Sequence, residues 1–157
     1  MNEPPPIPPM APLPANQRNV DEDHLNLLAI FHFVIAAFTV FGILFLVAHF
    51  TVMHFIFTNP AVWRDQRGGP PPAAIFGIFI VFYIIAGAIM VVIGILNVMS
   101  GFFLRERKNR MFSLVVAGIN CLHFPFGTIL GVFTFVVLCR VSVRMLYERA
   151  ALTPPSI

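Results

Sequence analysis

Charged side chains are scarce in this chain, and their scarcity excludes a water-soluble globular domain. They make up 11% of the 157 residues, whereas hydrophobic residues make up 58%. A soluble domain carries about 25% charged residues, so this chain cannot cover a water-facing surface and lipid must be its main solvent. The fold class that follows is all-α, an integral membrane four-helix bundle with a short C-terminal helical hairpin.

The motifs of common catalytic and metal sites are also absent. The sequence has no Cys-x-x-Cys pair, no His-Glu-x-x-His motif, no glycine-rich phosphate loop and no carboxylate inside its apolar runs. Its two cysteines, Cys121 and Cys139, lie in apolar runs at different depths, and we expect both to be small buried residues without a disulfide. Most basic residues border apolar runs, which argues against nucleic-acid binding. We therefore expect no enzyme activity, no cofactor and no metal.

Proline is concentrated at the N-terminus, where seven of the 14 prolines fall within residues 1–20. Such a tract lacks amide donors and apolar periodicity, so we expect an extended, disordered cytoplasmic tail. Asp21 and the two acidic residues after it favour the positive end of a helix and mark the expected start of the first helix. We assign 21–149 to the transmembrane domain and 150–157 to a flexible C-terminal tail.

Four apolar runs are candidate membrane spans. They lie at about 25–57, 73–104, 109–124 and 127–147. Pro125 and Gly127 separate the last two, and we interpret them as a hairpin turn because proline ends a helix and glycine permits left-handed angles. Four spans place eight of the ten basic residues on one side of the membrane, whereas three spans divide them five to five. The positive-inside rule therefore favours four spans with both termini in the cytoplasm.

The two runs that flank this turn are short. Each has about 12–14 apolar residues, or roughly 20 Å of helix, against about 30 Å of hydrocarbon in a bilayer. We therefore expect the turn to lie below the outer membrane surface. Non-helical backbone at that depth must be buried in protein or line a cavity, so we predict a shallow dent over Pro125–Thr128.

Polar side chains fall at similar depths on the four predicted spans. Counted from the basic boundary, they lie roughly 9–15 Å into the membrane. Polar groups in such bundles face the interior and hydrogen-bond there, so we predict one polar layer. Its members are His32, Asn97, Asn120 and Thr134. Hydrogen bonding between helices is one interpretation, and a proton, ion or cofactor site around His32, which titrates near neutral pH, is the other.

Small residues recur at regular spacing on two predicted helices. Gly87, Gly94 and Gly101 are seven residues apart, and Gly127 and Gly131 are four apart. In lipid, small residues let helix backbones approach closely. We therefore expect another helix, from this chain or from a second copy, to pack against these glycines.

The last apolar run is followed by Arg140, Arg144 and Arg149, which alternate with apolar residues. This pattern is typical of an interfacial helix end, and such basic groups attract anionic lipid. The expected partners are therefore the lipid bilayer, anionic lipid at these arginines, and either a second copy or another membrane protein. We expect no nucleic acid as a partner.

Two segments carry a resemblance to a known group of proteins. CLHFPFGTILGVFTFVVLCRVSVRMLYE at 121–148 and HLNLLAIFHFVIAAF at 24–38 resemble an uncharacterised family of small bacterial four-span membrane proteins with a Phe-Pro-x-Gly-Thr hairpin motif. The resemblance implies four spans in a bacterial cytoplasmic membrane and no catalytic residues. The expected function is that of a structural, accessory or self-associating multi-pass membrane component. The alternative is a membrane protein that binds a small molecule, ion or cofactor at the polar layer around His32.

Overall fold

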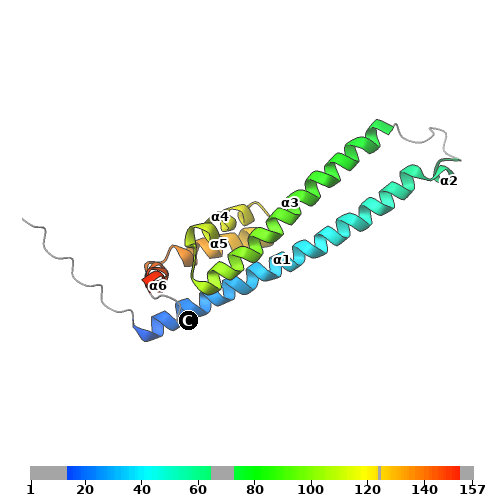
Figure 1. Cartoon of the computed structure of the whole chain (residues 1–157). Coiled ribbons are helices and arrows are strands. Elements are labelled where there is room, and N and C mark those ends of the chain that lie inside the picture. The colour runs from blue at the N-terminus through cyan, green and yellow to red at the C-terminus, as the bar shows by residue number, and fades with distance from the viewer. Residues whose placement is uncertain (1–13, 65–72, 124, 153–157) are drawn as a thin grey trace, which may run out of the picture.

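Six helices and no strand occur in the computed structural model over residues 14–64, 73–123 and 125–152, which are the residues it describes (Figure 1). The helices are α1 (Ala15–Thr58), α2 (Pro60–Trp63), α3 (Ala73–Glu106), α4 (Arg110–Cys121), α5 (Phe126–Leu138) and α6 (Val141–Leu152). The all-α helical bundle that the composition predicts is thus confirmed.

The two long helices, α1 and α3, lie side by side and form the axis of the molecule (Figure 1). They contain 44 and 34 residues, which correspond to about 66 and 51 Å of helix. Both are long and apolar enough to cross a membrane, and they include the predicted runs 25–57 and 73–104.

The short helices α4 and α5 form an antiparallel hairpin against one end of the α1–α3 pair (Figure 1). The chain reverses between them, and Pro125 is the N-cap residue of α5. With 12 and 13 residues, each helix is about 18–20 Å long. Neither can cross about 30 Å of hydrocarbon alone. α4 thus covers only part of the predicted span 109–124, and a full span there stays a prediction.

The buried core lies at the end of the long helices where the hairpin packs. Every buried residue of α1 falls between Asp21 and Ala36, and every buried residue of α3 between Asn97 and Leu104. Farther along, the outer faces of α1 and α3 are apolar and exposed; Phe41, for example, is 69% exposed. Exposed apolar patches on this scale indicate a membrane or protein partner.

The first helix begins earlier than the acidic residues predict. α1 starts at Ala15, after Pro14, so the tail expected over 1–20 ends too late; residues 1–13 lie outside the described ranges. Asp21 and Glu22 form ion pairs across the bundle instead of marking the helix start. Asp21 lies 3.6 Å from the Arg140 guanidinium. This pair joins the first turns of α1 to the end of α5.

The predicted run 127–147 is two helices rather than one. α5 ends at Leu138, and α6 follows at an angle of 72°. Arg140 lies at the break, where it is the first charged residue after the apolar run. A charged side chain is costly inside hydrocarbon, so the chain bends where Arg140 meets Asp21. α6 continues to Leu152, so the tail expected over 150–157 starts later; residues 153–157 are outside the described ranges.

The turn from α3 to α4 has two left-handed residues, Arg107 with φ 54° and Asn109 with φ 47°. Arg107 N–H donates to the Leu104 carbonyl at 3.4 Å, and Lys108 N–H donates to the Phe103 carbonyl at 2.9 Å. This pair of bonds is the Schellman arrangement, which usually has glycine in the left-handed position. The tight turn places the start of α4 directly beside the end of α3.

Both cysteines are free thiols. Cys121 is partly buried at the end of α4, whereas Cys139 is exposed at the end of α5. The expectation of a buried residue is therefore wrong for Cys139, because the bend before α6 leaves that position uncovered.

Candidate functional site

Three of the four predicted polar residues meet inside the bundle, and we call them the polar cluster. His32 of α1 donates from Nδ1 to Oδ1 of Asn97 on α3 at 2.9 Å. Asn120 of α4 donates from Nδ2 to the same oxygen at 2.8 Å. Asn97 Nδ2 donates back to Asn120 Oδ1 at 3.1 Å. All three side chains are at most 1% exposed.

Asn97 is the centre of the polar cluster. Its Nδ2 also donates to the Ile93 carbonyl oxygen at 2.9 Å. Both N–H groups of its amide and both lone pairs of its oxygen are therefore used. In lipid no water is available to replace such bonds. The polar cluster thus connects α1, α3 and α4 and holds the hairpin against the two long helices.

Thr134 of α5 is buried, but no hydrogen bond joins it to the polar cluster. Its Oγ1 has no hydrogen-bond partner within the described ranges. Ser100 and Ser113 are buried with unpartnered hydroxyls of the same kind, and the sequence reasoning missed both. Helical spacing was the available signal, because Ser100 follows Asn97 by three residues and Ser113 precedes Asn120 by seven.

The glycine series of α3 faces α1 of the same chain. A Cβ atom added at Gly94 would lie 3.3 Å from Thr39 Cγ2, and one at Gly101 would lie 2.9 Å from the ring of Phe33. At Gly87 the nearest atom of α1 would be 3.6 Å away, an ordinary contact. Small side chains therefore set the spacing between the long helices near the core.

The two glycines of α5 lie against the backbone of α4. A Cβ atom at Gly127 would lie 2.5 Å from the carbonyl oxygen of Asn120. At Gly131 it would lie 2.5 Å from the carbonyl oxygen of Ala117 and equally close to Cys121 Sγ. Backbone cannot yield as a flexible side chain can, so the hairpin requires glycine at both positions.

A cavity of about 550 Å³ lies beside the hairpin turn, and we call it the apolar cavity. Its walls come from α1, α3, α4 and α5 and are mostly apolar, with Phe38 and Phe126 among them. Thr39, Asn120 and His123 are polar wall residues, and the Thr39 hydroxyl donates to the Ile35 carbonyl. The volume is within the range of about 300–1,000 Å³ that is typical of small-molecule sites. The cavity reaches the turn region where the sequence predicts a dent, at Gly127.

The polar cluster reaches the apolar cavity at Asn120, whereas His32 is not a wall residue. The Asn120 amide is already bonded to Asn97. His123 is exposed at the turn, and its Nδ1 donates to the Ile119 carbonyl at 3.3 Å. Because Nε2 of His123 is not the nitrogen bonded to Ile119, His123 is the best placed of the three polar wall residues to meet a ligand.

The remaining histidines contact neighbouring side chains. His49 Nδ1 is hydrogen-bonded to the Tyr83 hydroxyl between α1 and α3, and the ring of His54 packs edge-on against Phe76. Over residues 14–64, 73–123 and 125–152, no three His, Cys, Asp or Glu side chains are grouped as metal ligands.

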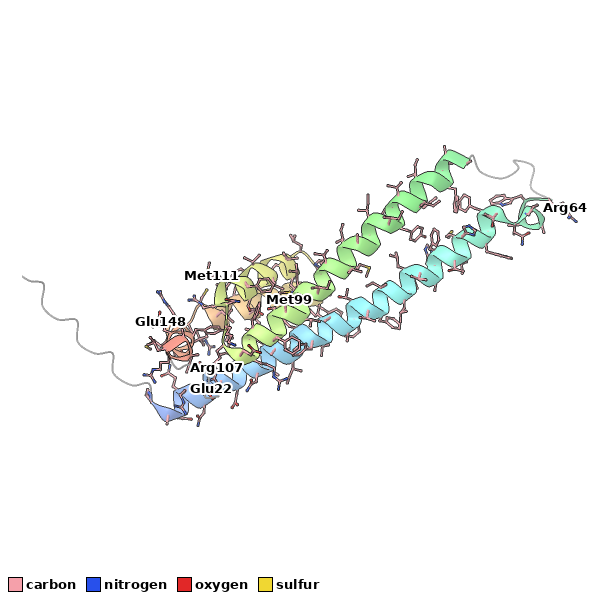
Figure 2. All side chains as sticks on the ribbon, in the orientation of Figure 1. Glu22, Arg64, Met99, Arg107, Met111 and Glu148 are labelled. Carbon is pink, nitrogen blue, oxygen red and sulfur yellow. The ribbon has the colours of Figure 1, made fainter. Side chains whose placement is uncertain are left out.

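A second cavity, of about 820 Å³, lies between the α3–α4 turn and α6, and we call it the basic cavity. Its walls carry four cations and two carboxylates, a net charge of +2. They are Arg107, Lys108, Arg110, Arg144, Glu106 and Glu148. Figure 2 shows Arg107 and Glu148 at this end of the molecule, near Glu22, and Arg64 at the opposite end.

Tyr147 of α6 also lines the basic cavity and is 8% exposed. Burial raises the pKa of Tyr147 to about 12, although the nearby charges of Arg110 and Arg107 act in the opposite direction. The Tyr147 hydroxyl and Arg110 Nε are both buried, and neither has a hydrogen-bond partner in the part of the chain that the structure describes.

No protein-family model, no curated protein and no solved structure matches this chain. Inferences about its function therefore depend on the geometry of the polar cluster, the two cavities and the exposed helix faces.

Proposed function

We propose that this chain is a non-enzymatic multi-pass membrane protein, a structural or accessory component that associates with itself or with another membrane protein. The observation that carries the proposal is the polar cluster. Its side chains bond to one another across three helices, and Nε2 of His32, which has no hydrogen-bond partner within the described ranges, is buried inside the bundle. Such bonds stabilise helix packing in lipid.

The proposed location is a bacterial cytoplasmic membrane, with both termini in the cytoplasm. The exposed apolar faces of α1 and α3 support the membrane location. The distribution of basic residues supports the orientation. The resemblance at 121–148 to the uncharacterised bacterial family supports a bacterial origin. Because α4 and α5 are too short to cross, the hairpin enters from the cytoplasmic side and returns to it.

Self-association is proposed through the uncovered part of the α1–α3 pair. Phe41 lies there and is 69% exposed, whereas Met111, on α4, is 70% exposed outside it. Single cysteines at Phe41→Cys and Met111→Cys, in a chain with Cys121 and Cys139 replaced by alanine, test this by oxidative cross-linking in membranes. The expected result is a dimer band for Phe41→Cys alone. Equal yields at both positions would contradict the proposed face.

Mass in detergent provides the second readout of self-association. The chain has a mass of 17.5 kDa, and the expected species is a multiple of that mass or a complex with a co-purifying membrane protein. A monomer without any co-purifying protein would overturn the proposed structural role.

A second candidate function is the binding of a small apolar molecule, and the apolar cavity favours it. The cavity combines apolar walls with a polar end at Asn120 and His123, which suits a hydrophobic molecule with a single polar group. The purified protein would then release such a molecule into organic solvent. Mass spectrometry of the extract, together with an absorbance spectrum, identifies it.

Paired tryptophan variants test this second function. Val34 lines the apolar cavity, whereas Ile30, one helical turn earlier on α1, is exposed and does not. Val34→Trp fills the cavity and should release the bound molecule, and Ile30→Trp should retain it. Equal retention by both variants would exclude the cavity as the site.

A further inference from the structure

The basic cavity lies where a membrane interface meets the bundle. α6 turns 72° away from α5, so it lies closer to the membrane plane if α5 follows the bilayer normal. At its two ends, Val141 and Leu152 are 72% and 82% exposed. A helix with basic residues and exposed apolar residues at this angle is typical of the interface. The basic cavity therefore lies beside lipid headgroups. This placement rests on the proposed membrane location.

Most cations of the basic cavity already have a carboxylate partner. Arg107 pairs with Glu22 at 3.1 Å, Lys108 with Glu106 at 3.0 Å, and Arg144 with Glu148 at 3.0 Å.

Arg110 is different, because no carboxylate within the described ranges lies at salt-bridge distance from it. Its Nε is buried without a hydrogen-bond partner, and the Tyr147 hydroxyl in the same wall is also buried and unpartnered. Buried donors without partners are costly and rare.

Arg110 is also the first residue of α4, and Asn109 makes no side-chain capping bond there. The first N–H groups of a helix favour an anion. The basic cavity thus has a net positive charge and three kinds of hydrogen-bond donor: the Arg110 guanidinium, the Tyr147 hydroxyl and the first N–H groups of α4. Their common partner is an oxyanion with several acceptor oxygens.

We propose that the basic cavity binds the phosphate group of an anionic glycerophospholipid, with Arg110 as its principal cation and Tyr147 as a second donor. The exposed apolar residues of α6 lie beside the acyl chains of that lipid. This site differs from the surface attraction expected at Arg140, Arg144 and Arg149, because it requires one particular guanidinium.

The test is lipid binding to the purified, delipidated full chain in detergent, measured by native mass spectrometry. The probes are phosphatidylglycerol, phosphatidylcholine and inorganic phosphate. Arg110→Gln is compared with Arg105→Gln, which removes the same charge from an exposed neighbour outside the cavity. A basic residue near an anionic surface contributes roughly fivefold without any site. A charge-assisted bond inside a cavity contributes roughly 10- to 100-fold.

The expected result is preferential binding of phosphatidylglycerol, with a loss of roughly 10- to 100-fold in Arg110→Gln and about fivefold or less in Arg105→Gln. Equal losses in the two variants would overturn the proposal. Inorganic phosphate should bind far more weakly than the lipid, and equal binding would overturn the assignment to a lipid.

Tyr147→Phe gives an independent reading if Arg110→Gln fails to fold. It is isosteric and should weaken phosphatidylglycerol binding roughly three- to tenfold; unchanged binding overturns the proposal. Failure of the proposed function is separable from failure of this site. Release of the wild-type chain from membranes by alkaline carbonate would disprove the membrane location. A firmly integrated chain whose Arg105 and Arg110 variants behave alike would disprove only the site.

Discussion

Replacing Asn97 with alanine should destabilise the bundle more than any other single polar substitution in its core. Asn97→Ala removes four side-chain hydrogen bonds, of which three are between helices, one with His32 and two with Asn120. Measured hydrogen bonds between membrane helices average about 0.6 kcal/mol and reach about 1.7. The expected loss in the free energy of unfolding is therefore about 2 kcal/mol, with an upper limit of about 5.

The assay is reversible unfolding in bicelles, followed by a probe on the hairpin. Asn26→Ala is the matched control, because Asn26 is an exposed asparagine on α1 outside the core. It reports the change in helix propensity, which favours alanine by a few tenths of a kcal/mol. The difference between the two variants measures the contribution of the polar cluster.

A double-mutant cycle separates the Asn97–Asn120 pair from the rest of the polar cluster. Because these two side chains exchange two bonds, the double alanine variant should lose about 1 kcal/mol less than the sum of the single variants. If Asn97→Ala were no more destabilising than Asn26→Ala, the claim that the polar cluster holds the hairpin would be refuted.

Two further substitutions have clear expected outcomes. Gly131→Ala places a Cβ atom 2.5 Å from the backbone of α4 and should destabilise the hairpin. The control is Gly77→Ala, whose added Cβ atom would meet nothing within 4 Å, and the effect at Gly131 should be several times larger. Similar unfolding of both variants would contradict the close α4–α5 contact. Tyr147→Phe should be neutral or stabilising without lipid, because its hydroxyl is buried and unpartnered within the described ranges. The raised pKa of Tyr147 means that the folded state favours the neutral phenol, so wild type should lose stability between pH 10 and about 12. An identical alkaline profile in Tyr147→Phe would refute this.

Depth counting along helices predicted much of the candidate site. The position of Asn97 eight residues before Arg105, and of Asn120 ten after Arg110, was enough to bring the two amides together. This worked because the rise per residue is constant and both helices start from the same basic boundary. Thr134 is buried as well, but its position along the helix does not set which neighbour its hydroxyl can reach.

Tertiary contacts explain what the sequence could not predict. No proline or glycine marks the bend after α5; it depends on Arg140 meeting Asp21, more than 100 residues earlier in the chain. The left-handed turn at Arg107 was equally hidden, because arginine is not a residue that favours positive φ. Its ion pair with Glu22, from α1, becomes visible only once the bundle has formed.

The apolar cavity lies where the sequence predicts a hollow, although its volume and walls depend on tertiary contacts. The short arms of the hairpin predicted a dent at the turn, and the cavity lies there. Labelling of a single introduced cysteine from outside would test how open the turn is to solvent. That cysteine must not replace Gly127, where a Cβ atom would lie 2.5 Å from the Asn120 carbonyl oxygen. Phe126 is 78% exposed and is the better position for labelling from outside.

The central claim is that the chain reverses at the hairpin, so that the basic segments before and after it lie on one side of the membrane. The most direct measurement is the location of a dual reporter fused after Ile157, compared with the same reporter inserted after Arg64. The account predicts cytoplasmic fluorescence at the first position and external phosphatase activity at the second. External phosphatase activity after Ile157 would contradict it.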